Sequence, residues 1–414
     1  MHSRLFPAAL AAALAFAFST EPAGAQEWTR FRGPNGSGIA NAPNFPAQFS
    51  EADFNWKIEL PGSGHSSPVI WGARVFVTAT PAGTAKRAIL CIDAKTGKTL
   101  WTREYETAAF REHVDNSYAS MSPAVDAERV YVWWGAPEGS AIVALDQKDG
   151  REVWKRDLGA FVSQHGPGAS PIVAGDAVLL NFDKDEPGSY LAAFDAKSGK
   201  ELWKHGHPGE KSSASTPCLL KNPDGKTEAI LISQTVGMTA VDVATGKVTW
   251  EMPGLLPKRC VASPVVTDGG LVIGQCGEGQ AESFVYAVKP GSGGRPAEKI
   301  YEVVRTGGYV PCPTAVGGLL FLWKENGFVT CLRAANKEQV WSERIDGPFY
   351  GSPIALNGRL YNITKRGELV VIGAGDRFEK IARIPLGEGS FATPAVSGGR
   401  MYLRTFTHLI SVGK

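Results

Sequence analysis

The chain has 414 residues, of which 43% are hydrophobic and 20% are charged, and its formal net charge is +2. This composition is that of a globular protein, because a disordered chain combines few hydrophobic residues with a high net charge. The 43 basic and 41 acidic residues nearly balance and form no Lys/Arg run, which disfavours nucleic acid as a partner.

The N-terminus has the features of a secretory signal peptide. Arg4 gives a basic start, residues 5–18 are apolar, and Ala23-Gly24-Ala25 offers small residues for cleavage. The alternative, an uncleaved membrane anchor, is disfavoured because this apolar stretch is short. No later segment has 18 uninterrupted apolar residues, so we expect no transmembrane segment in the mature chain. We therefore predict a signal peptide at residues 1–25 and an exported protein, periplasmic or extracellular.

Residues 26–53 form a lead-in that precedes the repeated part of the chain. Because this lead-in lies outside the repeats, we expect that its removal up to Gln48 would leave the rest of the protein folded.

From residue 67 onward, a Ser-Pro, Thr-Pro or Cys-Pro pair enters an apolar run eight times. The prolines of these pairs are Pro68, Pro123, Pro171, Pro217, Pro264, Pro313, Pro353 and Pro394. Successive copies are 40 to 55 residues apart, and a period of this length built from short strands and glycine turns is typical of a β-propeller.

The first copy shows how one repeat builds one blade. Residues 67–70 begin a strand, and residues 74–78 and 88–92 supply two more strands rich in β-branched and aromatic residues. Asp93-Ala94-Lys95-Thr96-Gly97-Lys98 then makes a tight turn in which glycine is free to take a positive φ. Residues 99–102 form the fourth strand. Four antiparallel strands per copy correspond to one propeller blade.

The two ends of the repeated region complement each other. The eighth copy ends after Leu409-Ile410-Ser411-Val412 without an outer strand, and Phe54-Asn55-Trp56-Lys57-Ile58 matches the missing piece. Closure by this strand removes exposed sheet edges. We predict an all-β fold: one domain, residues 54–414, forming an eight-bladed β-propeller of four-stranded antiparallel blades closed by an N-terminal strand.

A tryptophan recurs on the outer strand of most copies. These residues are Trp101, Trp154, Trp203, Trp250 and Trp341. Because they repeat at a fixed blade position, we interpret them as anchors between neighbouring blades rather than as stacking platforms for sugars or bases.

Six cysteines in an exported chain permit disulfides. Cys260 and Cys276 flank the turn Thr267-Asp268-Gly269-Gly270 almost symmetrically, which makes them the best guess for a bridge. Cys91 and Cys331 occupy equivalent strand positions and are expected to be buried thiols. Six cysteines allow fifteen pairings, so the connectivity stays open.

The Ser/Thr-Pro strand starts combined with Asp-Ala-x-Thr/Ser-Gly-Lys-x-x-Trp resemble the repeat of the quinoprotein, or PQQ-type, propellers over residues 54–412. Two branches share this repeat: dehydrogenases that use pyrroloquinoline quinone, and non-enzymatic propellers such as the lipoprotein subunit of the outer-membrane β-barrel assembly machine. The stretch 28–38 is similar to a lead-in of uncharacterised exported propellers of planctomycete-type bacteria.

The resemblance to the alcohol-dehydrogenase branch implies a vicinal Cys-Cys pair, a tryptophan platform and a Glu/Asn/Asp set that holds calcium against the quinone. This chain has no adjacent cysteines and lacks the long inter-blade insertions of that branch. We therefore assign no catalytic, cofactor-binding or metal-binding residue. No cofactor is expected, and pyrroloquinoline quinone remains possible without supporting residues.

The loops that enter each first strand should meet the loops between second and third strands at one face of the ring. Reading back from each proline identifies the candidate binding residues there, which are His65, Tyr118, His165, Lys211, Arg259, Tyr309, Tyr350 and Phe391. Aromatic and cationic side chains around a concave mouth suit an anionic or planar ligand, or a peptide. The alternative is that they fill and plug the channel.

Two other groups of residues contain side chains that could bind a metal ion. His65, His113 and His165 could converge as zinc ligands, but no H-x-H or H-E-x-x-H spacing supports this. Asp183-Lys184-Asp185-Glu186 lacks the ligand pattern of a calcium loop and is interpreted as a solvated loop tip. The first functional hypothesis is thus an exported, monomeric, non-catalytic propeller that binds a protein, peptide or envelope component. The alternative is a quinone-dependent alcohol or sugar oxidoreductase with an atypical site.

Overall fold

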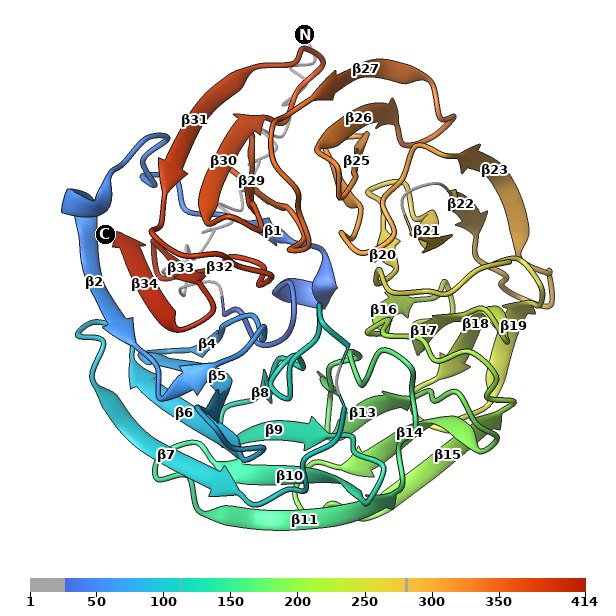
Figure 1. Cartoon of the computed structure of the whole chain (residues 1–414). Coiled ribbons are helices and arrows are strands. Elements are labelled where there is room, and N and C mark those ends of the chain that lie inside the picture. Colours follow the sequence, from blue (N-terminus) through green and yellow to red (C-terminus); the bar gives the residue numbers. More distant parts are fainter. Residues whose placement is uncertain (1–26, 112, 280–281) are drawn as a thin grey trace, which may run out of the picture.

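A computed structural model describes residues 27–111, 113–279 and 282–414, and these form a ring of eight β-sheets around a central channel (Figure 1). The sheets are antiparallel blades whose strands follow sequence order from the channel to the rim, so the predicted eight-bladed β-propeller is confirmed. The predicted signal peptide, residues 1–25, lies outside the described residues. Within the described part of the chain, no helix is long and apolar enough to cross a membrane.

The first four blades run anticlockwise from the blue end of the chain at the left to the green part at the lower right of Figure 1. Their strands are β4 (Val69–Trp71), β5 (Arg74–Pro81), β6 (Arg87–Asp93) and β7 (Thr99–Tyr105); β8 (Ala124–Val125), β9 (Arg129–Trp134), β10 (Ser140–Asp146) and β11 (Glu152–Gly159); β12 (Ile172–Ala174), β13 (Ala177–Phe182), β14 (Ser189–Asp195) and β15 (Glu201–His207); and β16 (Cys218–Lys221), β17 (Thr227–Ser233), β18 (Gly237–Asp242) and β19 (Val248–Met252).

The last four blades complete the ring. Their strands are β20 (Val265–Val266), β21 (Val272–Glu278), β22 (Glu282–Lys289) and β23 (Glu298–Val304); β24 (Thr314–Val316), β25 (Leu319–Trp323), β26 (Phe328–Arg333) and β27 (Gln339–Arg344); β28 (Ile354–Leu356), β29 (Arg359–Ile363), β30 (Glu368–Gly373) and β31 (Lys380–Pro385); and β32 (Ala395–Ser397), β33 (Arg400–Arg404), β34 (His408–Gly413) and the N-terminal β2 (Phe54–Glu59). Four short elements lie outside this pattern: β1 (Ile39–Ala40), β3 (Gly62–Ser63) and the 3₁₀ turns η1 (Pro34–Gly36) and η2 (Glu51–Asp53).

The ring closes through its N-terminal strand, as the sequence predicted. β2 pairs antiparallel with β34, with Trp56 opposite Ser411 and Lys57 opposite Ile410. The last blade therefore gains its outer strand from the start of the propeller domain, which leaves no unpaired edge on the third strand of that blade.

At the outer seam, each tryptophan reaches into the next blade. The indole Nε1 of Trp154 on β11 donates to the carbonyl of Ala196 at 2.9 Å, and its ring lies against Gly199. A Cβ on Gly199 would stand 2.5 Å from that ring, and the residue has a φ of 67°. Glycine is therefore required at this position of the repeat for two reasons: its φ is positive, and the indole ring of the tryptophan leaves no room for a side chain. Trp154 is 6% exposed, so the interpretation of these tryptophans as inter-blade anchors is confirmed.

Where a copy lacks this tryptophan, another aromatic residue takes its place. Tyr301 on β23 donates from Oη to the carbonyl of Ala334 at 2.8 Å. Between the seventh and eighth blades, Phe45 of the lead-in packs against Gly413 and makes an edge-to-face contact with Tyr361, with ring centroids 6.0 Å apart. The seam is thus filled even in the divergent copies.

The residue before each proline forms a closed ring of hydrogen bonds around the channel. In every blade the backbone N–H of this residue donates to the side chain of the equivalent residue in the next blade, over 2.8 to 3.1 Å. The members of this Ser/Thr ring, in order, are Ser67, Ser122, Ser170, Thr216, Ser263, Cys312, Ser352 and Thr393. The repeated Ser/Thr-Pro motif is therefore a structural device, because each buried N–H finds its acceptor in the adjacent blade.

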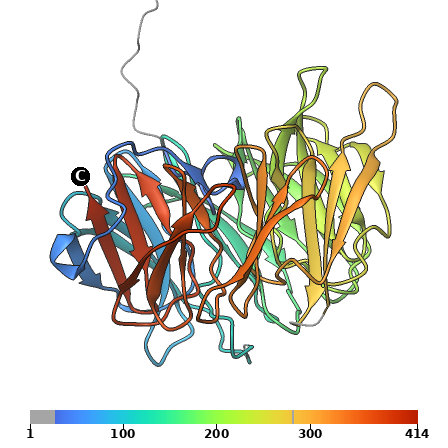
Figure 2. The same cartoon turned by 90° about the horizontal axis from the view of Figure 1, so that it is seen from above.

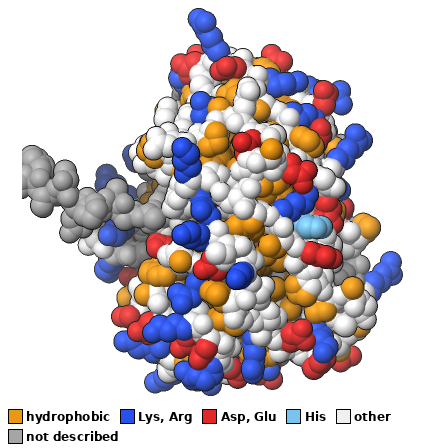
Figure 3. Space-filling view, turned by 90° about the vertical axis from the view of Figure 1, so that its left-hand side faces the viewer, with side chains coloured by type: hydrophobic (Ala, Val, Ile, Leu, Met, Phe, Trp, Pro, Cys, Tyr) orange, Lys and Arg blue, Asp and Glu red, His pale blue; other side chains and the backbone are white. Residues whose placement is uncertain are grey.

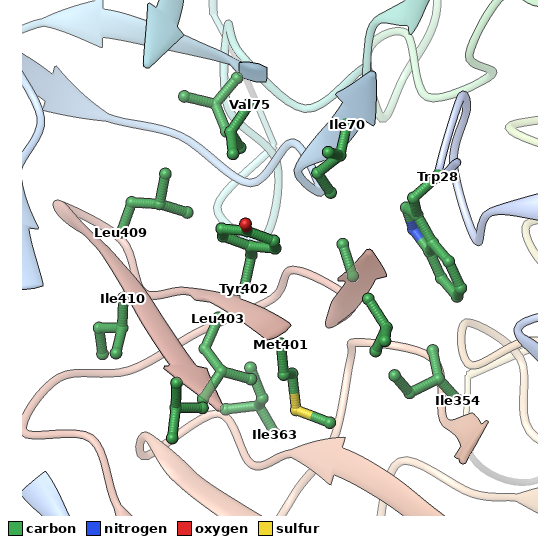
Figure 4. Packing of buried hydrophobic residues seen from close by; sticks show 14 of the residues in the cluster. Trp28, Ile70, Val75, Ile354, Ile363, Met401, Tyr402, Leu403, Leu409 and Ile410 are labelled. Carbon is green, nitrogen blue, oxygen red and sulfur yellow. The ribbon is translucent and has the colours of Figure 1, made fainter. Parts of the chain in front are cut away.

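The lead-in precedes the repeats in the sequence, but in the structure it enters the channel of the ring. Trp28 is fully buried, exchanges backbone hydrogen bonds with Ile70 at 2.8 and 3.1 Å, and packs beside the inner strands of three blades (Figure 4). Gly33 adopts a φ of 65°, and a Cβ there would lie 2.4 Å from the ring of Trp28. This burial changes the expectation that residues up to Gln48 can be removed without consequence.

Two arginines tie the lead-in to proline carbonyls of the channel. Arg30 donates to the carbonyl of Pro217, and Arg32 donates from Nη2 to the carbonyls of Pro313 and Pro353 at 3.0 and 3.2 Å. Burial lowers the pKa of Arg30 to about 10. We call residues 28–38 the plug. Figure 2 shows the disc from the side, with the lead-in along one face.

All six cysteines are free and buried in the structure, so the bridge guessed between Cys260 and Cys276 is wrong. The antiparallel bridge between Arg259 and Gly277 places the two cysteines opposite each other on neighbouring backbone segments. Residues directly opposite in an antiparallel pair have Cβ atoms about 4.5–5.5 Å apart, whereas a disulfide requires about 3.5–4.5 Å.

The outside of the ring carries mixed charge. On the side that faces left in Figure 1, basic and acidic side chains are interspersed (Figure 3).

Candidate functional site

Above the Ser/Thr ring, on the face opposite the plug, lies a cavity of about 250 Å³ to which all eight blades contribute. Its lining residues are Phe31, His65, Ser67, His113, Asp115, Asn116, Ser120, Ser122, His165, Gly166, Pro167, Gly168, Ser170, Ser212, Ala214, Arg259, Val261, Tyr309, Val310, Cys312, Tyr350, Ser352, Phe391 and Thr393. We call this the loop-face cavity. Its floor is made by members of the Ser/Thr ring together with Phe31, the tip of the plug.

Six of the eight candidate residues line this cavity, namely His65, His165, Arg259, Tyr309, Tyr350 and Phe391. The other two do not. Tyr118 donates from Oη to the carbonyl of Phe110 at 2.5 Å and lies under the guanidinium of Arg87, 4.5 Å from its ring centroid. Lys211 is exposed. Tyr118 therefore supports a loop, and a binding role for the remaining six stays a prediction.

The connection from β7 to β8, residues 106–123, supplies residues that the sequence analysis did not assign to a binding site. It is longer than other entry connections such as residues 345–353, and it carries His113, Asp115 and Asn116 to the cavity. The signal for these residues was the 55-residue spacing between the first two prolines, which exceeds every other spacing in the chain.

Asp115 joins this connection to the seventh blade. It accepts hydrogen bonds from Tyr350 Oη at 2.8 Å and from Lys365 Nζ at 3.0 Å. Burial alone would raise the pKa of Asp115, but the bonds from Lys365 and Tyr350 outweigh it and hold the pKa below its usual value. The carboxylate is therefore ionised and engaged at neutral pH.

A second ion pair lies across the cavity. Arg259 Nη1 contacts Asp185 Oδ1 at 3.3 Å and Ser212 Oγ at 2.6 Å. Asp185 also accepts the backbone N–H groups of Gln164 and Ser212, both at 2.6 Å. Asp183 is 1% exposed. The interpretation of residues 183–186 as a solvated tip is therefore wrong for these two aspartates, because the loop folds inward against Arg259.

Aromatic rings form one wall of the cavity. The ring centroid of Phe391 lies 4.6 Å from that of His65 and 4.8 Å from that of Tyr350. Lys365 Nζ stands 4.0 Å from the centroid of Tyr350. Burial, followed by the charge of Arg404, lowers the pKa of His65 to about 4, so this imidazole is neutral at physiological pH.

Two of the three histidines weighed as zinc ligands lie side by side. The rings of His113 and His165 are 4.6 Å apart, yet among the residues that the structure describes no group of three or more His, Cys, Asp or Glu could hold a metal ion. Burial, followed by the charge of Arg259, lowers the pKa of His165.

A family model described as outer membrane protein assembly factor BamB matches residues 50–132, 85–280 and 281–380. The chain belongs to this family. No curated protein matches this chain significantly.

Solved structures share the fold of this BamB-family protein at low sequence identity. Quinohemoprotein alcohol dehydrogenase from Comamonas testosteroni aligns with a TM-score of 0.67 at 14% identity, over 94% of this chain and 80% of that chain. Quinohemoprotein alcohol dehydrogenase ADHIIG from Pseudomonas putida HK5 gives 0.66 at 14% identity, over 94% and 80%. A europium-containing methanol dehydrogenase gives 0.60 at 13% identity, over 93% and 90%. At these identities the likeness extends to the fold alone.

The lining does not fit a quinone held with a metal as the alcohol-dehydrogenase resemblance implied. Among the described lining residues the one carboxylate is Asp115, which is engaged by Lys365 and Tyr350. Adjacent cysteines are absent from the sequence. No chemical step through a quinone follows from these residues.

Proposed function

We propose that this protein is an exported, monomeric, non-catalytic propeller that binds a protein, peptide or envelope component through its loop face. The observation that carries the proposal is the loop-face cavity. Every blade contributes to its wall, and the residues on that wall are the ones that differ between copies. A concave, mostly apolar site with a few convergent polar groups is what a binding site requires.

The side chains around the cavity support binding rather than bond-breaking chemistry. Among the described lining residues, the serine that hydrogen-bonds a carboxylate is Ser212, and its partner Asp185 is already paired with Arg259, so this carboxylate is not a free base that could activate the hydroxyl. The ring serines instead accept backbone N–H groups.

Site-specific photo-crosslinking tests the proposal. A benzophenone amino acid placed at Val114, which is 89% exposed at the cavity rim, should capture a component of an envelope extract. The same group at Leu202, which is 51% exposed on the outer strand β15, serves as the matched control. Capture from Val114 should fall when Ala214→Trp fills the cavity. Equal capture from both positions, or capture unaffected by Ala214→Trp, would contradict the proposal.

A quinone assay tests the alternative function. The purified protein is incubated with pyrroloquinoline quinone and calcium, desalted, and examined for bound quinone and dye-linked oxidation of alcohols or sugars. We expect neither retention nor turnover. Retention with turnover would replace the binding function by an oxidoreductase.

A further inference from the structure

The charges that border the loop-face cavity compensate one another. Arg259 pairs with Asp185, and Lys365 pairs with Asp115 at 3.0 Å. From the sequence alone, the cationic residues around the mouth suggest an anionic ligand. Because each of these two cations already has a carboxylate partner, an anionic ligand would have to displace a carboxylate before it could use either of them.

The charged groups buried behind the wall are hydrogen-bonded to the backbone. Arg404, fully buried, donates to the carbonyls of Ser66 and Thr78, and Glu325, 8% exposed, accepts the backbone N–H of Tyr309 at 2.6 Å. Burial raises the pKa of Asp183 to about 7. Arg30 and Arg32 lie on the other side of the Ser/Thr ring, where they bind proline carbonyls.

Three polar side chains on the wall keep free hydrogen-bonding atoms. His65, His165 and Tyr309 line the cavity, and the structure shows no hydrogen bond from their side chains to any other described residue. Burial lowers the pKa of both imidazoles and raises the pKa of Tyr309 to about 12. At neutral pH all three are therefore uncharged, and each can donate or accept one hydrogen bond.

The remaining surface is aromatic or small. Phe31 closes the floor, and Tyr350 and Phe391 stand against each other on the wall at a ring angle of 64°. The volume of about 250 Å³ is below the roughly 300–1,000 Å³ typical of sites for drug-sized ligands. A single ring system matches this size and this surface.

We propose that the loop-face cavity takes an uncharged aromatic side chain of a peptide, a phenol or an indole, whose polar atom bonds His65, His165 or Tyr309. This inference rests on the proposed binding function and names its ligand class. Rings stack edge-to-face or offset on Tyr and Phe, and one O–H or N–H is matched by the few free groups on the wall. A hexose would carry several hydroxyls into a mostly apolar cavity, where those left without a partner cost binding energy.

Small probes test the ligand class directly. N-acetyl-L-tyrosinamide and N-acetyl-L-tryptophanamide represent the side chains, N-acetyl-4-carboxyphenylalaninamide places a carboxylate where the phenol stands, and methyl glucoside represents a sugar. Affinities are measured by calorimetry and by ligand-observed NMR. We expect the tyrosine probe to bind at least about tenfold more tightly than the carboxylate probe, because the buried carboxylate would find no free cation.

Three variants sharpen this test. Asp115→Asn leaves Lys365 without its carboxylate, so the preference for the phenol over the carboxylate should fall by about tenfold or reverse. Tyr309→Phe, which removes one free hydroxyl and keeps the ring, should weaken the tyrosine probe several-fold. Lys211→Ala, at an exposed position outside the cavity, is the control and should change neither affinity.

Each contrary outcome is distinct from failure of the proposed function. Tighter binding of the carboxylate probe by the unmodified protein would overturn the inference, as would binding of methyl glucoside without the aromatic probes. Absence of binding by both aromatic probes at millimolar concentration would overturn it as well. The binding function itself is decided separately, by the crosslinking experiment at Val114 with its control at Leu202 and the variant Ala214→Trp.

Discussion

The outer seam of this propeller repeats the same contact between blades, whereas the inner channel is lined by residues that vary between blades. At the seam the same contact recurs: Trp56, Trp101 and Trp203 donate to a carbonyl of the next blade at 3.2, 3.1 and 2.8 Å, as Trp154 does at 2.9 Å. At the channel only the Ser/Thr ring recurs, and the cavity-lining residues that precede it vary from blade to blade.

This difference separates stability from recognition. A contact repeated around a ring contributes a similar free energy of stabilisation at each interface between blades, as in other repeat proteins. A cavity lined by different residues from each blade can be shaped one residue at a time with little effect on those interfaces. Substitutions at the seam should therefore unfold the protein, whereas substitutions at the cavity should change what it binds.

The largest expected effect is the loss of ring closure. Deleting residues 27–60 removes the plug and β2, and it exposes the edge of β34. We expect loss of cooperative unfolding in thermal scans. Deleting only 27–48 removes Trp28 and Phe45 and should cost more than about 3–5 kcal/mol, the usual range for a single buried aromatic. If the shorter deletion melts like the full-length protein, the plug has no structural role.

The architecture could be predicted from the sequence because its signals are local and repeated. The proline spacing, the Asp-Ala-x-Thr-Gly-Lys turn and the match of residues 54–58 to a missing strand each survive in several copies. The plug and the ion pairs could not be predicted. Arg32 reaches Pro313 across 281 positions, and Asp115 reaches Lys365 across 250. Such contacts depend on ring geometry, which no local pattern encodes.

For the site, the positions before each proline were sufficient to predict six residues of the cavity. They did not predict which of these residues form ion pairs or hydrogen bonds. The sequence predicts a cationic residue at position 259 but not its ion-pair partner, because Asp185 lies in a different loop. Tyr118 was misplaced because the connection 106–123 folds back on itself through Phe110. Entry-loop length decides whether the residue before the motif faces the channel.

The seam itself is tested by Trp154→Ala. Truncation of this buried side chain leaves a cavity between the second and third blades and should cost about 3–5 kcal/mol in urea unfolding. Leu202→Ala, at a half-exposed position on β15, is the control and should stay within about 0.5 kcal/mol. Affinity of the remaining folded protein for its ligand should be unchanged. A loss of unfolding free energy smaller than that of Leu202→Ala would contradict the role of Trp154 as an anchor between blades.

The glycine partner of the tryptophan allows a finer test. Gly199→Ala and Gly175→Ala both place a side chain at a positive φ, 67° and 63°. Only Gly199 has a ring within reach, since a Cβ on Gly175 meets nothing within 4 Å. The backbone cost of about 1–2 kcal/mol is common to both, so overpacking should make Gly199→Ala worse by a further 1–3 kcal/mol or so. Equal urea unfolding midpoints for Gly199→Ala and Gly175→Ala would show that the indole ring of Trp154 can move away from the added methyl group.

Substitution of one member of the Ser/Thr ring should remove a single hydrogen bond between two blades. Ser170→Ala deprives the backbone N–H of Ser122, 3.0 Å away, of its acceptor. Leaving this buried donor unpaired should cost about 1–3 kcal/mol. Ser170→Thr keeps the hydroxyl and should be close to neutral, because threonine already serves at positions 216 and 393. Similar losses for both variants would point to packing at this position rather than to the hydrogen bond.

The smallest effect is expected at the cavity rim, from the pair between Asp115 and Lys365. These side chains are 29% and 28% exposed, so the pair should contribute at most about 1 kcal/mol. Because the pKa of Asp115 is depressed in the folded protein, its contribution is complete above the unfolded pKa of about 3.9 and is lost as the pH falls through the folded pKa. The stability gap between the unmodified protein and Asp115→Asn should therefore be constant from pH 7 down to about 5 and then close on further acidification. Urea titrations at pH 7, 5 and 3.5 measure the gap, with Lys211→Ala as a control whose gap should not change with pH. A gap that widens toward low pH would mean that Asp115 is stabilised in its protonated form, and the cavity would then carry one positive charge without a partner.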